Sequence, residues 1–209
     1  MMMLATASAE EKAGMEVRKQ DKLYTFDEWM SWDEDVRAEI HDGKLVMMAP
    51  PTLEHQEISG AIFAQFHAHL KGKPCKVYAG PVGVRLEMRD HTVFEPDIIV
   101  VCDQSKLEGK IICTGAPDLV VEILSPSTVR YDTFIKFQKY QAAGVAEYWI
   151  VDPESKAVQV FLLENGRYVS YMYQSHDVIP VAVLPGCEIA LADVFEEEDI
   201  EEPITADHA

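Results

Sequence analysis

The stretch PDLVVEILSPST, residues 117–128, constrains the fold most, because it places one carboxylate in an otherwise apolar run. Side chains alternate along a strand, which predicts one face of Leu119, Val121 and Ile123 and an opposite face of Asp118, Val120, Glu122 and Leu124. Both faces are largely apolar, which is typical of a central strand covered on both sides. The run therefore predicts a mixed α/β domain with Glu122 in its interior.

The buried charge of Glu122 requires a partner, because an ionised carboxylate in the interior costs several kcal/mol unless it is paired or bound to a metal. A second apolar run, FEPDIIVVCD, carries Asp97 at its entrance. If the two strands are neighbours, the carboxylates of Asp97 and Glu122 repel one another and need a cation between them. Two carboxylates completed by waters commonly hold Mg²⁺. We therefore expect Asp97 and Glu122 to bind Mg²⁺ or Mn²⁺.

The segment after this strand, residues 127–144, is predicted to be a helix with Ser127 or Thr128 as its N-cap. Asp132, Lys136 and Tyr140 follow at intervals of four and lie on one helical face. The turn at SPS folds this helix back over the end of the strand. Lys136 is then expected to reach the carboxylates and to orient water or stabilise charge on a phosphate.

Each of these residues also has a purely structural interpretation. Asp97 would cap a turn after the preceding proline, and Glu122 would form an ion pair with Arg85. Lys136 would be an exposed residue paired with the acid four positions before it, and Tyr140 a half-buried core aromatic. One shared cation explains both strand carboxylates, which favours the catalytic interpretation of the group as a whole.

The rest of the chain predicts two main helices beside a sheet. The first helical pattern covers residues 25–40, with Thr25 as N-cap, and is followed by an Asp-Gly turn. The second covers residues 52–71. A hairpin is expected around Glu-Asn-Gly at 164–166. Strands are predicted at 44–50, 75–80, 83–88, 96–103, 117–124, 147–153, 157–163 and 167–173, with one or two short strands after 178. The run EYWIVD within 147–153 is most simply a strand with packing aromatics.

The net charge and the composition of individual segments limit the expected domain boundaries, partners and location of the protein. The formal net charge is −18, which argues against simple electrostatic attraction to nucleic acid. We expect a flexible leader at 1–20, one domain at 21–194 and an acidic tail at 195–209. No stretch approaches the roughly 18 apolar residues of a membrane span, and no basic region precedes the first apolar patch. A cytoplasmic protein without membrane contact is the expectation.

The four cysteines, Cys75, Cys102, Cys113 and Cys187, include no Cys-x-x-Cys pair. Their neighbours are mostly apolar or lie near predicted strands. Reduced, partly buried thiols are therefore favoured over a disulfide framework or zinc ligation.

Several segments together resemble the Uma-two family of proposed restriction endonucleases, a branch of the PD-(D/E)XK nuclease superfamily. They are AEIHDGKLVMMAPP at 38–51, His55, EPD at 95–97, PDLVVEILSPST, then Asp132, Lys136, Tyr140 and GVAEYWIVDP at 144–153. The resemblance covers residues 22–192. It implies a restriction-endonuclease-like fold, a mixed central β-sheet flanked by α-helices, with a Mg²⁺-dependent phosphodiesterase site.

The resemblance also implies roles for individual residues. Asp97 matches the motif aspartate and Glu122 the acid of the third motif. That motif continues with a lysine two positions on, where this chain has Leu124. In some branches the lysine lies on the following helix, and Lys136 is placed to substitute for it. Glu39, expected near the end of the first helix, resembles an additional acid that supports the metal.

Three functions are consistent with these features. Metal binding at Glu122 and a basic patch around the cleft would discriminate among them. The first is a metal-dependent DNA endonuclease whose cleft draws on Lys44, Lys71, Lys73, Arg85, Arg130 and Lys136. The second is a catalytically inactive interaction module of the same fold, favoured by Leu124 and the acidic charge. The third is an unrelated metal-dependent hydrolase acting on a small phosphate ester.

Two further expectations concern the surface. His55 either lies over the active cleft or is a surface or capping residue of its helix. A homodimer would be supported if the hairpin strands at 157–173 expose Val158, Val160 and Leu162, although these residues also suit internal packing.

Overall fold

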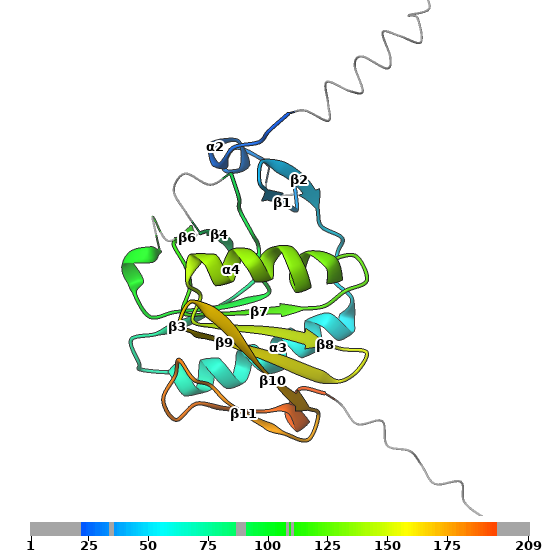
Figure 1. The fold of residues 1–209 in the computed structure, drawn as a ribbon, viewed down its shortest axis with the longest axis vertical. Coiled ribbons are helices and arrows are strands. Elements are labelled where there is room, and N and C mark those ends of the chain that lie inside the picture. Colours follow the sequence, from blue (N-terminus) through cyan, green and yellow to red (C-terminus); the bar gives the residue numbers. More distant parts are fainter. Residues whose placement is uncertain (1–21, 34–35, 87–90, 108, 110, 196–209) are drawn as a thin grey trace, which may run out of the picture.

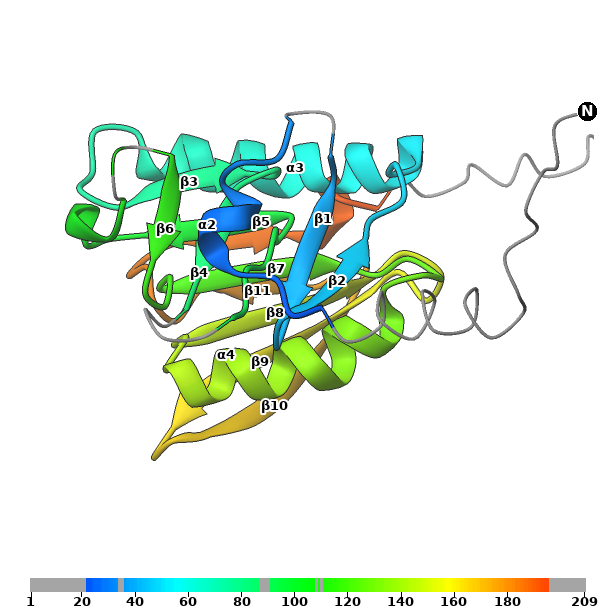
Figure 2. The same ribbon diagram turned by 90° about the horizontal axis from the view of Figure 1, so that it is seen from above.

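A mixed six-stranded sheet, with strand order β10-β9-β8-β7-β5-β3, forms the centre of the molecule. The computed structural model describes residues 22–33, 36–86, 91–107, 109 and 111–195. Helices α3 and α4 lie on opposite faces of the sheet (Figures 1 and 2). Only β7 and β8 run parallel, and the other neighbours pair antiparallel. The predicted mixed sheet flanked by helices is confirmed.

The helices and strands follow one another along the described part of the chain. The helical elements are α2 (Phe26–Trp29), α3 (Leu53–Leu70), η1 (Gln104–Lys106), the π-helical η3 (Tyr131–Lys136), α4 (Phe137–Ala143) and η4 (Leu191–Asp193). The strands are β1 (Ala38–His41), β2 (Lys44–Met47), β3 (Lys76–Ala79), β4 (Gly83–Arg85), β5 (Ile98–Val101), β6 (Ile112–Thr114), β7 (Leu119–Ile123), β8 (Glu147–Asp152), β9 (Ala157–Glu164), β10 (Arg167–Gln174), β11 (Val178–Pro180) and β12 (Glu188–Ala190).

The prediction of one helix over residues 25–40 was wrong. Thr25 does cap a helix and forms a capping box with Glu28, but α2 ends at Trp29. Residues 38–41 form β1, which pairs with β2. Asp42 and Gly43 connect the two strands with φ of 49° and 80°, the left-handed conformation of a two-residue hairpin turn. The Asp-Gly turn therefore specifies a strand on each side of it.

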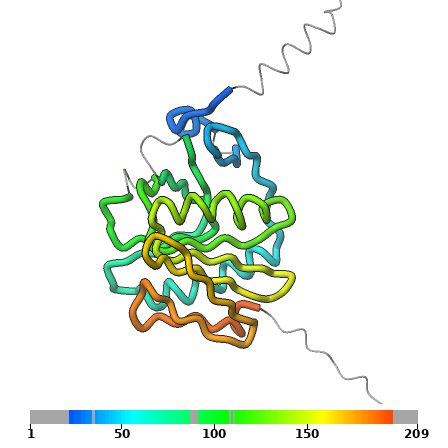
Figure 3. Tube along the Cα trace, viewed as in Figure 1, coloured from blue at the N-terminus to red at the C-terminus, as the bar shows by residue number. Residues whose placement is uncertain are grey.

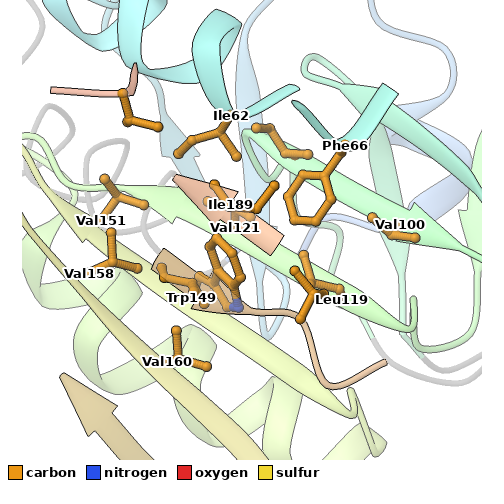
Figure 4. Close-up of a cluster of buried hydrophobic side chains, with 14 of the residues drawn as sticks. Ile62, Phe66, Val100, Leu119, Val121, Trp149, Val151, Val158, Val160 and Ile189 are labelled. Carbon is orange, nitrogen blue, oxygen red and sulfur yellow. The ribbon is translucent and has the colours of Figure 1, made fainter. Parts of the chain in front are cut away.

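Helix α3 packs against one face of the sheet, as the pattern over 52–71 predicted. Thr52 accepts a hydrogen bond from the N–H of His55 and begins the helix. Ile62 and Phe66 face the sheet, and Phe66 lies 5.6 Å from Trp149, ring centroid to ring centroid (Figure 4). The core on this face draws on β5, β7, β8, β9 and β12 as well as α3.

The argument for a homodimer from residues 157–173 fails, because Val158 and Val160 are not exposed. Their relative exposures are 0% and 2%, and both belong to the core beneath α3. Phe195, placed at the start of the expected acidic tail, is also buried in this core. The expected leader at 1–20 and the tail from 196 onward lie outside the described residues.

Strand β7 is central, as predicted. Leu119, Val121 and Ile123 belong to the core beneath α3, whereas Val120 belongs to the core beneath α4, together with Tyr140. All five residues of β7 are buried. The predicted alternation therefore turns Glu122 toward the α4 face.

The expectation of four reduced cysteines was wrong for two of them. Cys75 and Cys102 form a disulfide, while Cys113 and Cys187 are free and buried. The bridge follows from the sheet register, because Lys76 pairs with Val101 and continuing that register places Cys75 beside Cys102. No helix in the part of the chain that the structure describes is long and apolar enough to pass through a bilayer.

Candidate active site

Lys136 lies at the centre of a buried cluster of carboxylates. Its Nζ is 2.8 Å from Glu39 Oε1, 3.0 Å from Glu122 Oε1 and 3.2 Å from Asp132 Oδ1. The lysine side chain is only 2% exposed, so its interpretation as an exposed surface residue was wrong. The pairing with Asp132 is present, but as one contact of three. Lys136 thus reaches Glu122, as predicted.

A π-helical turn positions Lys136. The helix after β7 is π-helical over Tyr131–Lys136 and becomes the regular α4 at Phe137. Asp132, Lys136 and Tyr140 are all buried on the face toward the sheet. Tyr148 on β8 donates its hydroxyl to the backbone carbonyl of Asp132 at 3.0 Å. Single π-helical turns are rare and frequently occur at functional sites.

Glu122 is held by two donors from this helix. Its Oε1 accepts a hydrogen bond from Lys136 and another, of 2.9 Å, from the Tyr140 hydroxyl. Tyr140 is fully buried, with an exposure of 0%, and its ring also packs against Phe94. The expected ion pair between Glu122 and Arg85 is replaced by these contacts, because the guanidinium of Arg85 lies over the Phe26 ring at 4.3 Å.

Glu39 reaches the cluster from β1 rather than from the end of a helix. One carboxylate oxygen, Oε1, contacts Lys136 and accepts the backbone N–H of Glu95 at 2.8 Å. The other, Oε2, lies 2.6 Å from His41 Nε2. Glu39 therefore lies next to Lys136, but the helical element predicted for it was wrong.

Asp97 lies across the sheet from Glu122. β5 pairs antiparallel with β7, with Ile98 opposite Val121, and continuing this register one step places Asp97 opposite Glu122. Asp97 Oδ2 accepts the backbone N–H of Ile123 at 2.7 Å. The carboxylate thus joins neighbouring strands and does more than cap the local turn.

His55, from the first turn of α3, lies over Asp97. Its Nε2 is 3.3 Å from Asp97 Oδ2, and the two side chains are 13% and 22% exposed. The interpretation of His55 as a surface or capping residue was wrong. Burial lowers the pKa of His55, but the hydrogen bond that His55 donates to Asp97 and the charge of Asp97, with smaller contributions, together outweigh burial and leave this pKa raised. The histidine therefore holds the one carboxylate of the group that is partly open to solvent.

The cluster has more negative than positive charge. Burial raises the pKa of Glu122 well above its usual value against the pull of Lys136, and the charges of Asp132, Asp97 and Glu39 raise it further. Burial would also raise the pKa of Glu39, but Lys136 and His41 outweigh it and lower this pKa to about 2. Burial is the largest single effect on Lys136 and lowers its pKa, but the charges of Glu122, Glu39 and Asp132 together outweigh burial and raise this pKa well above the usual value.

A divalent cation beside Lys136 would take its ligands from the carboxylates of this cluster. Three carboxylates, those of Glu39, Glu122 and Asp132, contact the lysine, and Asp97 lies opposite Glu122 in the sheet register. Buried Asp132 Oδ1 has an ion-pair contact with Lys136 but no hydrogen bond of good geometry. Within the described residues, no group of three or more His, Cys, Asp or Glu side chains is placed to hold a metal ion. An ion here would take two carboxylates and complete its shell with water and phosphate, which is typical of Mg²⁺.

Sequence reasoning missed two members of the site. His41 lies between the rings of Phe94 and Tyr131, at 4.8 and 5.0 Å, and orients Glu39. Glu95 is partly buried, and burial raises its pKa while Arg37 lowers it. The Asp-Gly turn directly after His41 marked a hairpin strand and could have identified this histidine.

A cavity of about 250 Å³ gives access to the cluster. It lies between β2 and the start of the helix, and Glu39, Asp132 and Lys136 line it together with Ser127 and Thr128. Lys136 thus lines this cavity although its side chain is only 2% exposed.

Comparisons with known proteins agree with this arrangement. Residues 24–192 match the Uma2 family, described as "Putative restriction endonuclease". An uncharacterized protein from Synechocystis sp. is 29% identical over 156 residues, which are 72% of this chain and 80% of that protein. A crystal structure from Anabaena variabilis, described as "a putative nuclease belonging to DUF820", superposes with a TM-score of 0.67 at 20% identity and covers 82% of this chain and 97% of that one. This likeness shows a shared fold.

Proposed function

Because the chain belongs to the Uma2 family, we propose that it is a metal-dependent phosphodiesterase, a DNA endonuclease of the PD-(D/E)XK type. One observation carries the proposal: Lys136 Nζ lies 3.0 Å from Glu122 Oε1, and Asp97 stands opposite Glu122 in the sheet register. The contact supports Lys136 as the substitute for the motif lysine absent at Leu124.

Asp97 and Glu122 are the residues that would hold Mg²⁺ or Mn²⁺. When bound, such an ion polarises a phosphoryl oxygen and lowers the pKa of water. The chain itself contributes fixed donors. Lys136 presents an ammonium group that orients a water molecule and stabilises negative charge developing on the phosphate.

Tyr140, Glu39 and His55 hold the reacting groups in place. Tyr140 donates to Glu122, so the carboxylate keeps one orientation. Glu39 contacts Lys136 at 2.8 Å and limits the movement of the ammonium. His55 contacts Asp97 and fixes its carboxylate. Such supporting contacts commonly change metal affinity or activity by about 10- to 100-fold.

Titration calorimetry of Mn²⁺ into the metal-free protein tests the metal site. We expect saturable binding in the parent and its loss in Glu122→Gln and Asp97→Asn. Glu147→Gln is the matched control, because Glu147 is also a buried strand carboxylate but bonds Trp149 and Val183 instead of Lys136. The titration is repeated with a short phosphorothioate DNA strand, which supplies phosphate ligands without being readily cleaved.

A catalytically inactive interaction module of the same fold is the second candidate. Leu124 occupies the position of the motif lysine, and Lys136 already neutralises part of the charge of Glu39 and Glu122. This candidate predicts a folded protein that takes up no Mn²⁺ with or without the DNA strand and leaves DNA uncut when Mn²⁺ is added. Metal uptake that depends on Glu122 would argue against it.

A further inference from the structure

A second, larger cavity adjoins the active-site cavity along the same line between hairpin and helix. It has a volume of about 690 Å³ and is lined by residues of the β1–β2 hairpin and of η3 and α4. Figure 3 shows the course of the chain in this hairpin and in this helix. Leu45, Val46 and Tyr131 line both cavities. A chain-like ligand lying in the larger cavity would therefore lead directly to Lys136.

The larger cavity is locally basic on a strongly acidic chain. Lys44, Arg130 and Lys139 line it, against the single carboxylate of Asp42. Three cations and one anion leave a local charge of +2, whereas the whole chain carries −18. Lys139 is paired with Asp42, while Lys44 and Arg130 are exposed at its edge. Two of the predicted cleft cations thus lie together here.

Of the other predicted cleft cations, Lys136 lies in the carboxylate cluster and three lie elsewhere. Lys71 follows the C-terminal end of α3, with Lys73 just beyond it, and Arg85 contacts Phe26. On the side of the site that this cavity occupies, Lys44 and Arg130 are therefore the predicted cleft cations in place. An anionic substrate would be drawn to this side, because fixed cations raise the local concentration of anions even when the net charge is unfavourable.

The cavity also has an apolar floor, formed by Leu45, Val46, Ile135 and Ala142 beside the Tyr131 ring. A duplex presents phosphates and stacked base-pair edges, which do not fill an apolar hollow. An unpaired nucleotide offers both an apolar base and a phosphate, and single strands are typically bound by apolar or aromatic contacts to bases combined with cations along the backbone.

We infer that this cavity, defined as the hairpin–helix cavity, holds an unpaired nucleotide of the substrate strand next to the phosphate that is cut. Its base lies on the apolar floor and its backbone phosphates contact Lys44 and Arg130. The inference rests on the proposed function and specifies its substrate as single-stranded or locally unpaired DNA.

Fluorescence anisotropy in EDTA tests this inference without catalysis. Labelled single-stranded and duplex oligonucleotides of equal length are titrated with the parent and with Lys44→Gln, Arg130→Gln and Ala142→Trp. We expect tighter binding of the single strand, a loss of about three- to tenfold in affinity for each charge variant, and a salt-dependence slope reduced by about 0.7 for each lost phosphate contact. Ala142→Trp fills the cavity from an exposed helix position without changing charge, and it should weaken single-strand binding as well.

Lys71→Gln is the matched control, because it removes the same charge from the far end of α3. Equal losses in Lys71→Gln and Lys44→Gln would overturn the inference, since they would show an effect of net charge alone. Duplex binding as tight as single-strand binding, or unchanged binding in Ala142→Trp, would also overturn it. None of these outcomes changes the result expected from the Mn²⁺ titration. Failure of the single-strand inference can therefore be distinguished from failure of the proposed metal site.

Discussion

Lys136 Nζ lies 3.0 Å from Glu122 Oε1, although the two residues are 14 positions apart and belong to a helix and a strand. A lysine at position 124 would have approached the same carboxylate along the strand. The helix formed by η3 and α4 supplies the ammonium instead, because it folds back over the sheet on the face that carries Glu122. Lys136 and Glu122 are therefore brought together by the tertiary structure and not by their spacing along one strand.

The first prediction concerns the stability of this contact. Lys136→Met should lower the free energy of unfolding by about 3–5 kcal/mol, because it leaves buried carboxylates without their cation. The double variant Lys136→Met with Glu122→Gln should lose less than the sum of the single changes, since one unpaired charge is also removed. Urea unfolding of all four proteins measures this coupling. Single effects that add within about 0.5 kcal/mol would contradict it.

The second prediction is a pH dependence of stability from Glu39. Its pKa in the folded protein is about 2, below the ordinary 4.5, so the unfolded state binds more protons between these values. The stabilisation that the ionised Glu39 carboxylate gives the folded protein is therefore fully present above pH 4.5 and is lost as the pH falls through 2. The stability gap between the parent and Glu39→Gln should narrow by about 2 kcal/mol from pH 6 to pH 3.

Urea unfolding at several pH values measures that gap. Glu57→Gln is the control for removal of a negative charge, because Glu57 is an exposed carboxylate of α3. A stability gap for Glu39→Gln that stays constant with pH would show that Glu39 does not rely on Lys136 for its charge in the folded protein.

The third prediction concerns His55. His55→Gln should weaken Mn²⁺ binding by about tenfold, because the Asp97 carboxylate loses the group that orients it. His67→Gln is a control on the same helix, where His67 stacks on Phe63 instead of contacting a carboxylate. Calorimetric titration of both variants compares them. Equal Mn²⁺ affinities in the two variants would assign His55 a role in packing alone.

The fourth prediction tests the disulfide. Unfolded protein without reductant should expose two titratable thiols, those of Cys113 and Cys187, and four after reduction. Cys75→Ser with Cys102→Ser should leave the count at two in both conditions. Four thiols in the unreduced parent would show that the bridge does not form in solution.

Local sequence patterns predicted most of the secondary structure. The spacing of Ile58, Ile62 and Phe66 predicted α3, and the alternation around Glu122 predicted a central strand with two buried faces. Asn165 and Gly166 formed the expected hairpin turn, with φ of 50° and 78°. These features depend on side-chain periodicity and on turn residues, which act over a few positions of the chain.

The error at residues 38–41 arose where two local signals competed. The acids after Thr25 favoured a continued helix, whereas the Asp-Gly turn favoured a strand before it as well as after it. The hairpin formed because β1 buries all four of its residues, and the free energy gained by this burial exceeds the contribution of helix propensity. Glu39 consequently faces Lys136 from a strand.

The sequence by itself determined which residue types were available: the strand carboxylates Asp97 and Glu122, and a helix face with Lys136 and Tyr140. Only the tertiary structure decided that Glu39 reaches this lysine from β1, that His55 lies on Asp97, and that Cys75 meets Cys102. The reason is physical. Periodicity specifies which face a side chain occupies, whereas strand order and register specify which side chains meet across it.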